Sequence, residues 1–330
     1  MENALLRTRF TDLIGISHPI VSAPMASSAN AELVAAVSAA RGFGLIGASR
    51  SADDPARPAW LREQIRQTRS MTGEPFGVGL ALNFPQLDEL LEVALEERVA
   101  AVAISFGDVV PYVDRVHAAE TKILTQVQTV SEAKRLAGAG VDVLIAQGVE
   151  GGGHIGEIGI MSLLPAVLDA VDIPVLAAGG IADGRGLAAT LLMGGDGVLM
   201  GTRFVASAES ASGQWHKDAI ISASTDDTVR TLCFDLARNV PFPDGIAARV
   251  IRNKFTKQWH GQEAEIIARR DELDAEFAAA IGSGTPELSA MWAGSASGLI
   301  HAVEPAGEIV RQIATEAEQL LRRRPADVCR

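Results

Sequence analysis

The sequence predicts an α/β protein built on a (β/α)8 TIM barrel, with a small helical insertion or cap and a C-terminal helix. Short runs rich in Val, Ile and Leu recur eight times between residues 18 and 205, each followed by an amphipathic stretch. These runs are apolar throughout, which indicates strands buried on both faces of a parallel sheet. No G-x-G-x-x-G follows an early strand, so a barrel is favoured over an open dinucleotide-binding sheet.

The eight predicted strands are short and alternate with helix signals. They cover residues 18–25, 43–49, 75–82, 99–107, 121–127, 141–148, 173–180 and 195–202. Asn30 is a typical N-cap before a helical stretch that ends at a glycine. Thr129 opens a T-x-x-E capping box, and Asp183 starts the stretch before the last strand. Strand and helix therefore alternate as a barrel requires.

The segment from residue 206 onward breaks this rhythm. We predict a (β/α)8 barrel over 1–205, a helical insertion or cap over 206–290, and a segment 291–330 that packs back on the barrel. The stretches "AARVIRNKFTKQWHG" and "AEIIARRDELDAEFAAAI" are predicted as helices. "LRRR" at 321–324 complements the dipole at the end of a terminal helix.

Composition and charge exclude several classes of function. The chain has 29 Lys and Arg against 41 Asp and Glu, a formal net charge of −12, which disfavours nucleic acid or an anionic membrane as the main partner. No apolar run approaches the roughly 18 residues of a membrane span. The first ten residues lack the apolar core of a secretory signal. Cys233 and Cys329 could form one bridge, but we expect a reduced, cytoplasmic protein without a metal site.

The active site of such a barrel lies at the carboxyl ends of its strands. Ala23, Pro24 and Met25 follow the first strand. They would be either ordinary core or an apolar wall against a flat ring. Gln126 ends the fifth strand, where a barrel interior is usually apolar. Its amide needs a partner, which could be a neighbouring side chain or a ring carbonyl or nitrogen.

Two glycine-rich loops indicate a phosphate site. Gly179 and Gly180 follow the seventh strand, and Gly201 and Thr202 follow the eighth. Phosphates often bind at these two loops of a barrel, and exposed backbone N–H groups can hold a dianion without lysines. The alternative is that the glycines only permit tight turns. Because the pairs fall in adjacent loops, a phosphate site is favoured.

His154 follows three glycines in "EGGGHIGEIG", residues 150–159. A lone histidine is usually a surface or satisfied core residue, but this one falls in a loop of the predicted catalytic face. No second ligand stands at metal spacing and no G-x-S-x-G accompanies it. General acid–base chemistry is what one imidazole can do alone. Glu150 and Glu157 would either orient it or be solvated.

These residues resemble the nitronate monooxygenase family, formerly called 2-nitropropane dioxygenases, which includes flavin-dependent enoyl-acyl-carrier-protein reductases and NADH:quinone reductases. The resemblance is carried by "APMA", "QGVEGGGHIGE", "PVLAAGGIADGRGLAATLLMGGDGVLMGTRF" and "WAGSASGLI". It implies a TIM barrel that binds FMN non-covalently, with His154 as the catalytic residue and "SASGLI" closing over the mouth. The implied cofactor contacts are Ala23, Pro24, Met25, Gln126, Gly148, Gly153, Gly179, Gly180, Gly201 and Thr202.

The resemblance implies an FMN-dependent oxidoreductase that oxidises alkyl nitronates with dioxygen through a flavin semiquinone. His154 would be the base or would position the substrate. An alternative is an NAD(P)H-dependent reductase of an enoyl thioester or quinone, so NADH or NADPH stays open as reductant. A non-catalytic flavin- or phosphate-binding barrel is the alternative of another class. The expected partner is a small-molecule substrate, and a homodimer is compatible with the sequence.

The third strand departs from the family pattern. Many relatives carry Asn after the Phe-Gly-Val of this strand, whereas this chain has Gly79 there and Asn83 later. The sequence leaves open whether Asn83 takes over the role of the missing amide.

Overall fold

The computed structural model describes residues 6–26, 28–48, 55–283 and 287–329. Eight parallel strands close into a barrel in the order β1-β2-β3-β4-β5-β6-β8-β9. They are β1 (Ile20–Ser22), β2 (Phe43–Gly47), β3 (Phe76–Ala81), β4 (Ala101–Ser105), β5 (Lys122–Val127), β6 (Val143–Gln147), β8 (Val175–Ala178) and β9 (Gly197–Met200). The predicted (β/α)8 barrel is confirmed, with one strand inside each apolar run. Residue 49 of the predicted second strand and residues 1–5 of the predicted barrel lie outside the described residues.

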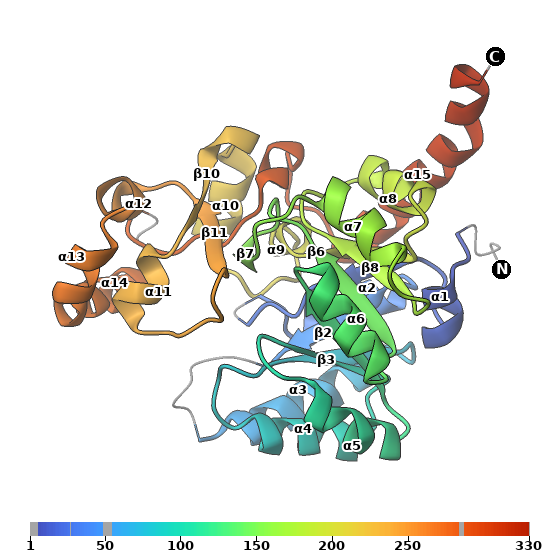
Figure 1. The fold of residues 1–330 in the computed structure, drawn as a ribbon, viewed down its shortest axis with the longest axis horizontal. Coiled ribbons are helices and arrows are strands. Elements are labelled where there is room, and N and C mark those ends of the chain that lie inside the picture. The colour runs from blue at the N-terminus through green and yellow to red at the C-terminus, as the bar shows by residue number, and fades with distance from the viewer. Residues whose placement is uncertain (1–5, 27, 49–54, 284–286, 330) are drawn as a thin grey trace.

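Helices follow the strands and cover the barrel, while α1 (Arg9–Ile14) precedes β1 and packs its Phe10 and Ile14 into the lumen cluster (Figure 1). The others are α2 (Ala31–Ala39), α3 (Arg57–Met71), α4 (Leu87–Glu96), α5 (Val113–Ala118), α6 (Val130–Gly138), α7 (Ile160–Leu168), α8 (Gly184–Leu192) and α9 (Thr202–Val205), with a 3₁₀ turn η1 (Val110–Tyr112) before α5. The Asn30, Thr129 and Asp183 side chains cap α2, α6 and α8 as predicted. The capping box at Thr129 is only half formed, because the Glu132 carboxylate accepts from Gln128 N at 3.2 Å.

Branched and aromatic side chains fill the lower lumen of the barrel. The inward-facing cluster joins α1 to every strand except β3, whose Gly77 leaves room for the Phe43 and Leu45 side chains. Side chains alternate along a strand, so the next inward residue after Leu124 is Gln126 and the next after Ile145 is Gln147. The apolar core therefore ends one layer below the carboxyl rim.

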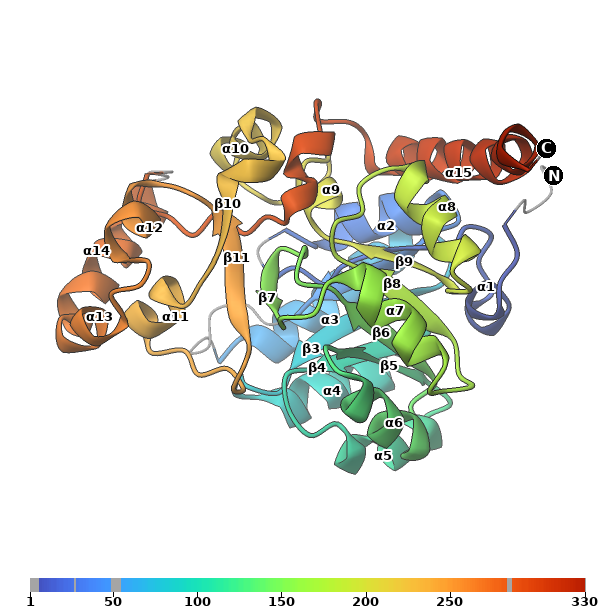
Figure 2. The ribbon, with the colours of Figure 1, turned by 45° about the horizontal axis from the view of Figure 1, so that its top comes forward.

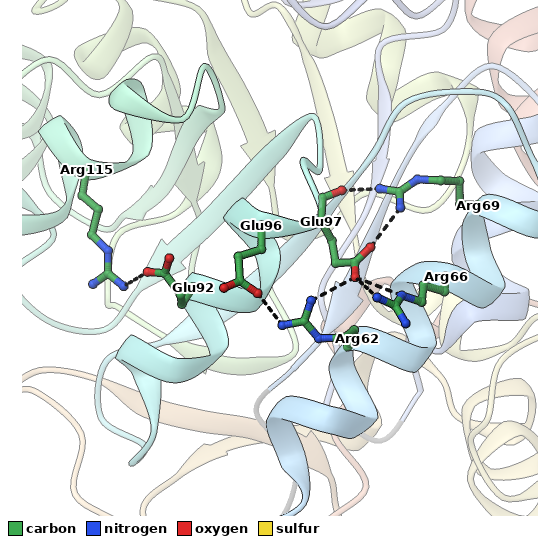
Figure 3. Close-up of polar contacts among 7 residues, drawn as sticks. All are labelled: Arg62, Arg66, Arg69, Glu92, Glu96, Glu97 and Arg115. Atoms are coloured by element: carbon green, nitrogen blue, oxygen red, sulfur yellow. Dashed lines mark hydrogen bonds and ion pairs between the residues drawn. The ribbon is translucent and has the colours of Figure 1, made fainter.

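An ion-pair cluster joins α3 to α4 on the outside of the barrel (Figure 3). The Glu97 carboxylate accepts from Arg62 at 3.0 Å, Arg66 at 2.8 Å and Arg69 at 3.1 Å. Burial acts to raise the pKa of Glu97, but the hydrogen bonds from these arginines outweigh it and lower the pKa. The cluster fixes the packing of α3 on α4, away from the carboxyl ends of the strands.

A second, three-stranded antiparallel sheet lies between the barrel and the outer helices (Figure 2). Its order is β10-β11-β7, formed by β10 (Thr228–Thr231), β11 (Ala247–Ile251) and β7 (Gly153–Ile155). Around it lie α10 (Gln214–Ser222), η2 (Thr225–Asp227), α11 (Cys233–Arg238), α12 (Lys254–Trp259), α13 (Glu263–Ala268) and α14 (Arg270–Ser283). The prediction of a helix over "AARVIRNKFTKQWHG" is right for α12 and wrong for 247–251. Pairing with β7, a distant segment, makes 247–251 a strand.

The C-terminal helix α15 (Ala306–Val328) packs on α8 and α2, confirming the predicted terminal helix. Its last turns project beyond the body of the protein (Figure 1). Cys233 and Cys329 are both free, and burial raises the pKa of the Cys233 thiol to about 11. Within the described part of the chain, no helix combines the length and apolarity needed to cross a bilayer.

Candidate active site

Gln126 of β5 and Gln147 of β6 stand in the uppermost layer of the lumen, and Gln128 lies just beyond β5. The Nε2 atoms of Gln126 and Gln128 both donate to Oε1 of Gln147, the latter pair at 3.0 Å. Gln147 is buried, and the other two amides are partly buried. Gln126 thus has a protein partner, yet its own Oε1 and the Gln147 Nε2 have none among the described residues. Gln147 ends β6 as Gln126 ends β5, and the same strand-end rule would have found it in the sequence.

The segment after β1 forms one side of this layer. Ala23 belongs to the inward-facing cluster, and its N–H donates to Met200 O. A Cβ on Gly79 would lie 2.0 Å from Cβ of Pro24. Gly79 is therefore a glycine because Pro24 occupies the space that a side chain would need. The Sδ of Met25 would lie 3.5 Å from a Cβ on Gly201. The carboxyl ends of β1 and β9 therefore meet at this rim.

The loops after β8 and β9 form a backbone cradle. Gly179 and Gly180 have φ of 99° and 72°, a region that side chains rarely adopt. Among the described residues, none accepts a hydrogen bond from the N–H of Gly180 or Thr202. The Thr202 Oγ1 is used, since it accepts from Gly294 N at 3.0 Å. The free N–H groups are donors of the kind that bind a phosphate.

Gly148 and Gly153 have local reasons to be glycine. A Cβ on Gly148 would lie 2.6 Å from Ile160 N, and Gly153 has φ 71° at the start of β7. Gly152 is packed against Gly294, so the segment before the 3₁₀ turn η3 (Ser295–Leu299) packs directly on the loop after β6. These positions shape the loop, and no feature of the described residues directs Gly148 or Gly153 toward a ligand.

His154 lies in the middle of β7, opposite Ala248 of β11. Its Nε2 is 2.9 Å from Oδ1 of Asp235 on α11, and the two side chains are 16% and 10% exposed. Asp235 therefore orients the imidazole. Neither Glu150 nor Glu157 does so. The Glu150 carboxylate accepts from Ile160 N at the start of α7, and Glu157 is exposed near Arg230.

Three aromatic rings surround His154. Phe242 stacks on the imidazole with centroids 3.5 Å apart and planes at 12°, Trp292 lies at 5.3 Å, and Phe106 stands edge-on at 6.1 Å. Phe106 directly follows β4 and has φ 65°, a strained backbone that is often found at functional sites. The rings make an apolar, partly closed surrounding for one polar group.

The segment that carries Phe242 is tied to the barrel. Asn83 Nδ2 donates to Pro241 O at 3.1 Å, so Asn83 holds this segment, and its Oδ1 is buried with no partner among the described residues. On the other side, His216 Nε2 donates to Trp292 O at 3.2 Å. Burial lowers the pKa of His216 to about 4, and the imidazole is neutral at pH 7. Neither Asp235 nor Phe242 could be linked to His154 from sequence, because they lie 81 and 88 positions further along the chain.

The residues at this rim fit FMN. The uppermost lumen layer offers two amides and small residues under a flat ring, and the cradle offers free N–H groups to a phosphate. No group of three or more His, Cys, Asp or Glu side chains in the described ranges could hold a metal ion. The arrangement offers hydrogen-bond donors suited to a phosphate, room for a flat ring, and an imidazole beside them.

The sequence model of the nitronate monooxygenase family matches residues 7–91 and 86–316. The chain belongs to the nitronate monooxygenase family. It is an enzyme of this group of FMN-dependent oxidoreductases, as the resemblance implied. A probable nitronate monooxygenase of Staphylococcus aureus is 30% identical, over 96% of this chain and 98% of the relative.

Solved structures agree with this family assignment. FabK from Thermotoga maritima is 38% identical with a TM-score of 0.88, covering 98% of this family member and all of that chain. A nitroalkane oxidase from Streptomyces ansochromogenes is 31% identical with a TM-score of 0.82, covering 95% and 98%. The enoyl reductase domain of MlnA from Bacillus amyloliquefaciens, at 15% identity and a TM-score of 0.74, shares the fold.

Proposed function

We propose that this family member binds FMN at the barrel rim and oxidises alkyl nitronates with dioxygen. The observation that carries the proposal is His154, a partly buried imidazole bonded to a carboxylate and surrounded by aromatic rings beside the rim. FMN, when bound, supplies the electron transfer to dioxygen that no side chain can provide. The protein contributes position, exclusion of water and a proton acceptor.

Each part of the rim has a role in this proposal. Gln126 and Gln147 would meet polar edges of the flavin ring, and Ala23, Pro24 and Met25 would lie along it. The N–H groups of Gly180 and Thr202 would hold the phosphate, with Gly179 and Gly201 giving the backbone its path. Gly148 and Gly153 would act indirectly, by shaping the loop that carries His154.

His154 would take the α-proton of a neutral nitroalkane. The C–H bond breaks, its electron pair moves into the nitro group to give the nitronate, and the proton goes to the imidazole. Phe106, Phe242 and Trp292 would exclude water from this step, which strengthens the electrostatic interactions around it. A nitronate supplied ready-made needs no such step, so His154 would then only position it.

A second candidate is an NAD(P)H-dependent reductase of an enoyl thioester or quinone. The likeness to FabK, at 38% identity and a TM-score of 0.88, favours this candidate. The aromatic surrounding of His154 also suits an unsaturated apolar substrate. His154 would then donate a proton to the reduced product instead of accepting one.

One pair of measurements separates the candidates. Purified protein carrying FMN is mixed with propyl nitronate under air, and separately with NADH or NADPH without oxygen. Nitronate oxidation requires fast turnover in the first mixture and no flavin bleaching in the second. Rapid bleaching by either nucleotide, followed by oxidation of the reduced flavin by crotonyl thioester or quinone, would establish the reductase instead. Protein that cannot be loaded with FMN would rule out both and favour a non-catalytic barrel.

The assembly state is a separate proposal. We expect a small-molecule substrate as the main partner, without nucleic acid or a membrane, and a homodimer is compatible with the chain. Light scattering on the eluted protein measures the mass directly, and a mass near 34.6 kDa would contradict the homodimer.

A further inference from the structure

The imidazole of His154 has one nitrogen engaged and one free. Nε2 is 2.9 Å from Asp235 Oδ1. Nδ1 has no hydrogen-bond partner among the described residues and is not among the buried unpaired atoms, so it stays accessible. Phe242 covers one face of the ring in parallel contact. A substrate can therefore meet a polar atom of this ring only at Nδ1.

The partner on Nε2 decides which nitrogen carries the proton. An ionised carboxylate only accepts hydrogen bonds, so Asp235 requires a proton on Nε2. In the neutral ring, Nδ1 then holds the lone pair. We propose that Asp235 is the positioning residue that fixes His154 in the Nε2–H tautomer and makes Nδ1 the atom that exchanges a proton with the substrate. This inference deepens the proposed function and rests on it for the identity of the substrate.

The surroundings of Asp235 strengthen its effect. Its side chain is 10% exposed, and its Oδ2 is buried with no partner in the described part of the chain. Within the described ranges, the imidazole is thus the one polar side chain that pairs with this carboxylate. When Nδ1 accepts a proton, a positive ring forms beside the buried negative charge and the pair becomes neutral overall.

The fold holds Asp235 rigidly. It lies on α11 directly after Phe234, which is fully buried against Phe255, Phe277 and Trp292. The N-terminus of α11 is fixed by Cys233 N donating to Thr231 Oγ1 at 3.2 Å. Because α11 follows β10 of the sheet that contains β7, His154 and Asp235 are positioned by the same framework.

The tautomer can be measured without turnover. Protein loaded with FMN and labelled with ¹⁵N-histidine gives long-range ¹H–¹⁵N correlations that distinguish the two tautomers, and His154→Ala identifies the signals of His154. At a pH where the ring is neutral, we expect a protonated Nε2 and an unprotonated Nδ1. The opposite tautomer, or a rapid mixture of both, overturns the inference. Because the signal needs no substrate, this outcome is independent of whether nitronate is oxidised.

A substitution tests the consequence. Asp235→Asn replaces a pure acceptor by an amide that can donate to Nε2, which favours the wrong tautomer. In serine proteases the analogous change lowers kcat about 10⁴-fold. We expect at least about a 10²-fold loss of kcat on a neutral nitroalkane, or on an enoyl thioester, with FMN content unchanged and the His154 signals moved to the other tautomer. Wild-type kcat with unmoved signals contradicts the inference.

The chain offers a matched control. His117 Nε2 is also 2.9 Å from an aspartate, Asp142 Oδ2, on the outside of the barrel. Asp142→Asn should change the His117 signals and leave the His154 signals and kcat as they are. If Asp235→Asn does not fold, the tautomer of the wild-type ring decides alone.

Discussion

The barrel and the sheet β10–β11–β7 supply different kinds of group to one site. The barrel supplies mainly backbone and small residues, such as Gly79 making room for Pro24 and Gly180 with its left-handed φ, together with the amides of Gln126 and Gln147. The segment between β10 and β11 supplies two side chains that converge on His154, Asp235 of α11 and Phe242 after it. In the proposed function, the first region would hold the cofactor and the second would surround a proton-transfer group.

This difference has a physical basis. A flat cofactor with a phosphate is recognised by shape and by backbone N–H groups, which each βα loop can present by itself. A histidine can act as an acid or base by itself, but a partner that fixes its tautomer decides which nitrogen exchanges the proton, and Asp235 comes from a second element packed beside it. The two regions should therefore fail in different ways when they are altered.

Changing the second region should cost activity and spare the cofactor. We expect His154→Ala to lower kcat/KM for a neutral nitroalkane by about 10²- to 10⁴-fold, and less for a preformed nitronate. FMN content should be unchanged, since the described contacts of His154 are to Asp235 and aromatic rings. Steady-state kinetics and the flavin-to-protein ratio measure both. The control is His117→Ala; equal losses in the two variants would remove the distinction between the regions.

Changing the backbone cradle should above all weaken FMN binding. Gly180→Ala forces a side chain into φ 72° where the N–H groups face the predicted phosphate, and we expect FMN affinity to fall at least about tenfold. Gly194→Ala is the matched control, because Gly194 has φ 94° on the open turn after α8. Gly180→Ala should lose somewhat more thermal stability, because its Cβ would also lie 3.1 Å from Cβ of Glu150, but only Gly180→Ala should release FMN in a fluorescence titration. Retention of FMN by Gly180→Ala would contradict the cradle.

Helix α10, bonded through His216 to Trp292 beside the second sheet, should respond to acid. Burial lowers the pKa of His216 from 6.5 to about 4. The unfolded chain therefore binds more protons than the folded one between these pH values, and the free energy of unfolding should fall as pH drops through this window, by about 1–3 kcal/mol. Urea unfolding at about pH 7 and about pH 5 measures the change. His216→Gln keeps a donor for Trp292 O and should flatten the slope; an unaltered slope would refute the assignment.

The smallest effect is expected in the barrel helices. Glu97→Gln should lower the free energy of unfolding at pH 7 by about 0.5–1 kcal/mol, since its arginine partners are partly exposed to solvent. The pKa of Glu97 is lowered, so its contribution is present above about 4.5 and disappears as pH falls through the lower folded value. Thermal unfolding of both proteins should converge in acid. Glu63→Gln, whose partner is Gln67, serves as control, and a gap that persists in acid would contradict the ion-pair explanation.

The sequence predicted the barrel because each βα unit carries its own signals. Apolar runs mark all eight strands, and the caps at Asn30, Thr129 and Asp183 act within one turn of their helices. The glycines of the cradle are also a local signal, since the positive φ of Gly179 and Gly180 depends on the residue type at each position and on no distant partner.

The second sheet could not be predicted in this way. Residues 247–251 form a strand because they pair with β7 and β10, although their own pattern also suits a helix. The same pairing brings α11 to the loop after β6 and sets Asp235 against His154, a contact across 81 positions. Glu150, only four residues from His154, instead serves the start of α7.

The sequence by itself determined the barrel, its glycine loops and the family, since local periodicity, backbone conformation and short motifs need no distant partner. Only the tertiary structure decided which carboxylate orients the imidazole, which rings enclose it and why position 79 has no side chain. Those features depend on contacts between segments far apart in the chain, and no residue spacing within a single sequence indicates which distant segments will meet.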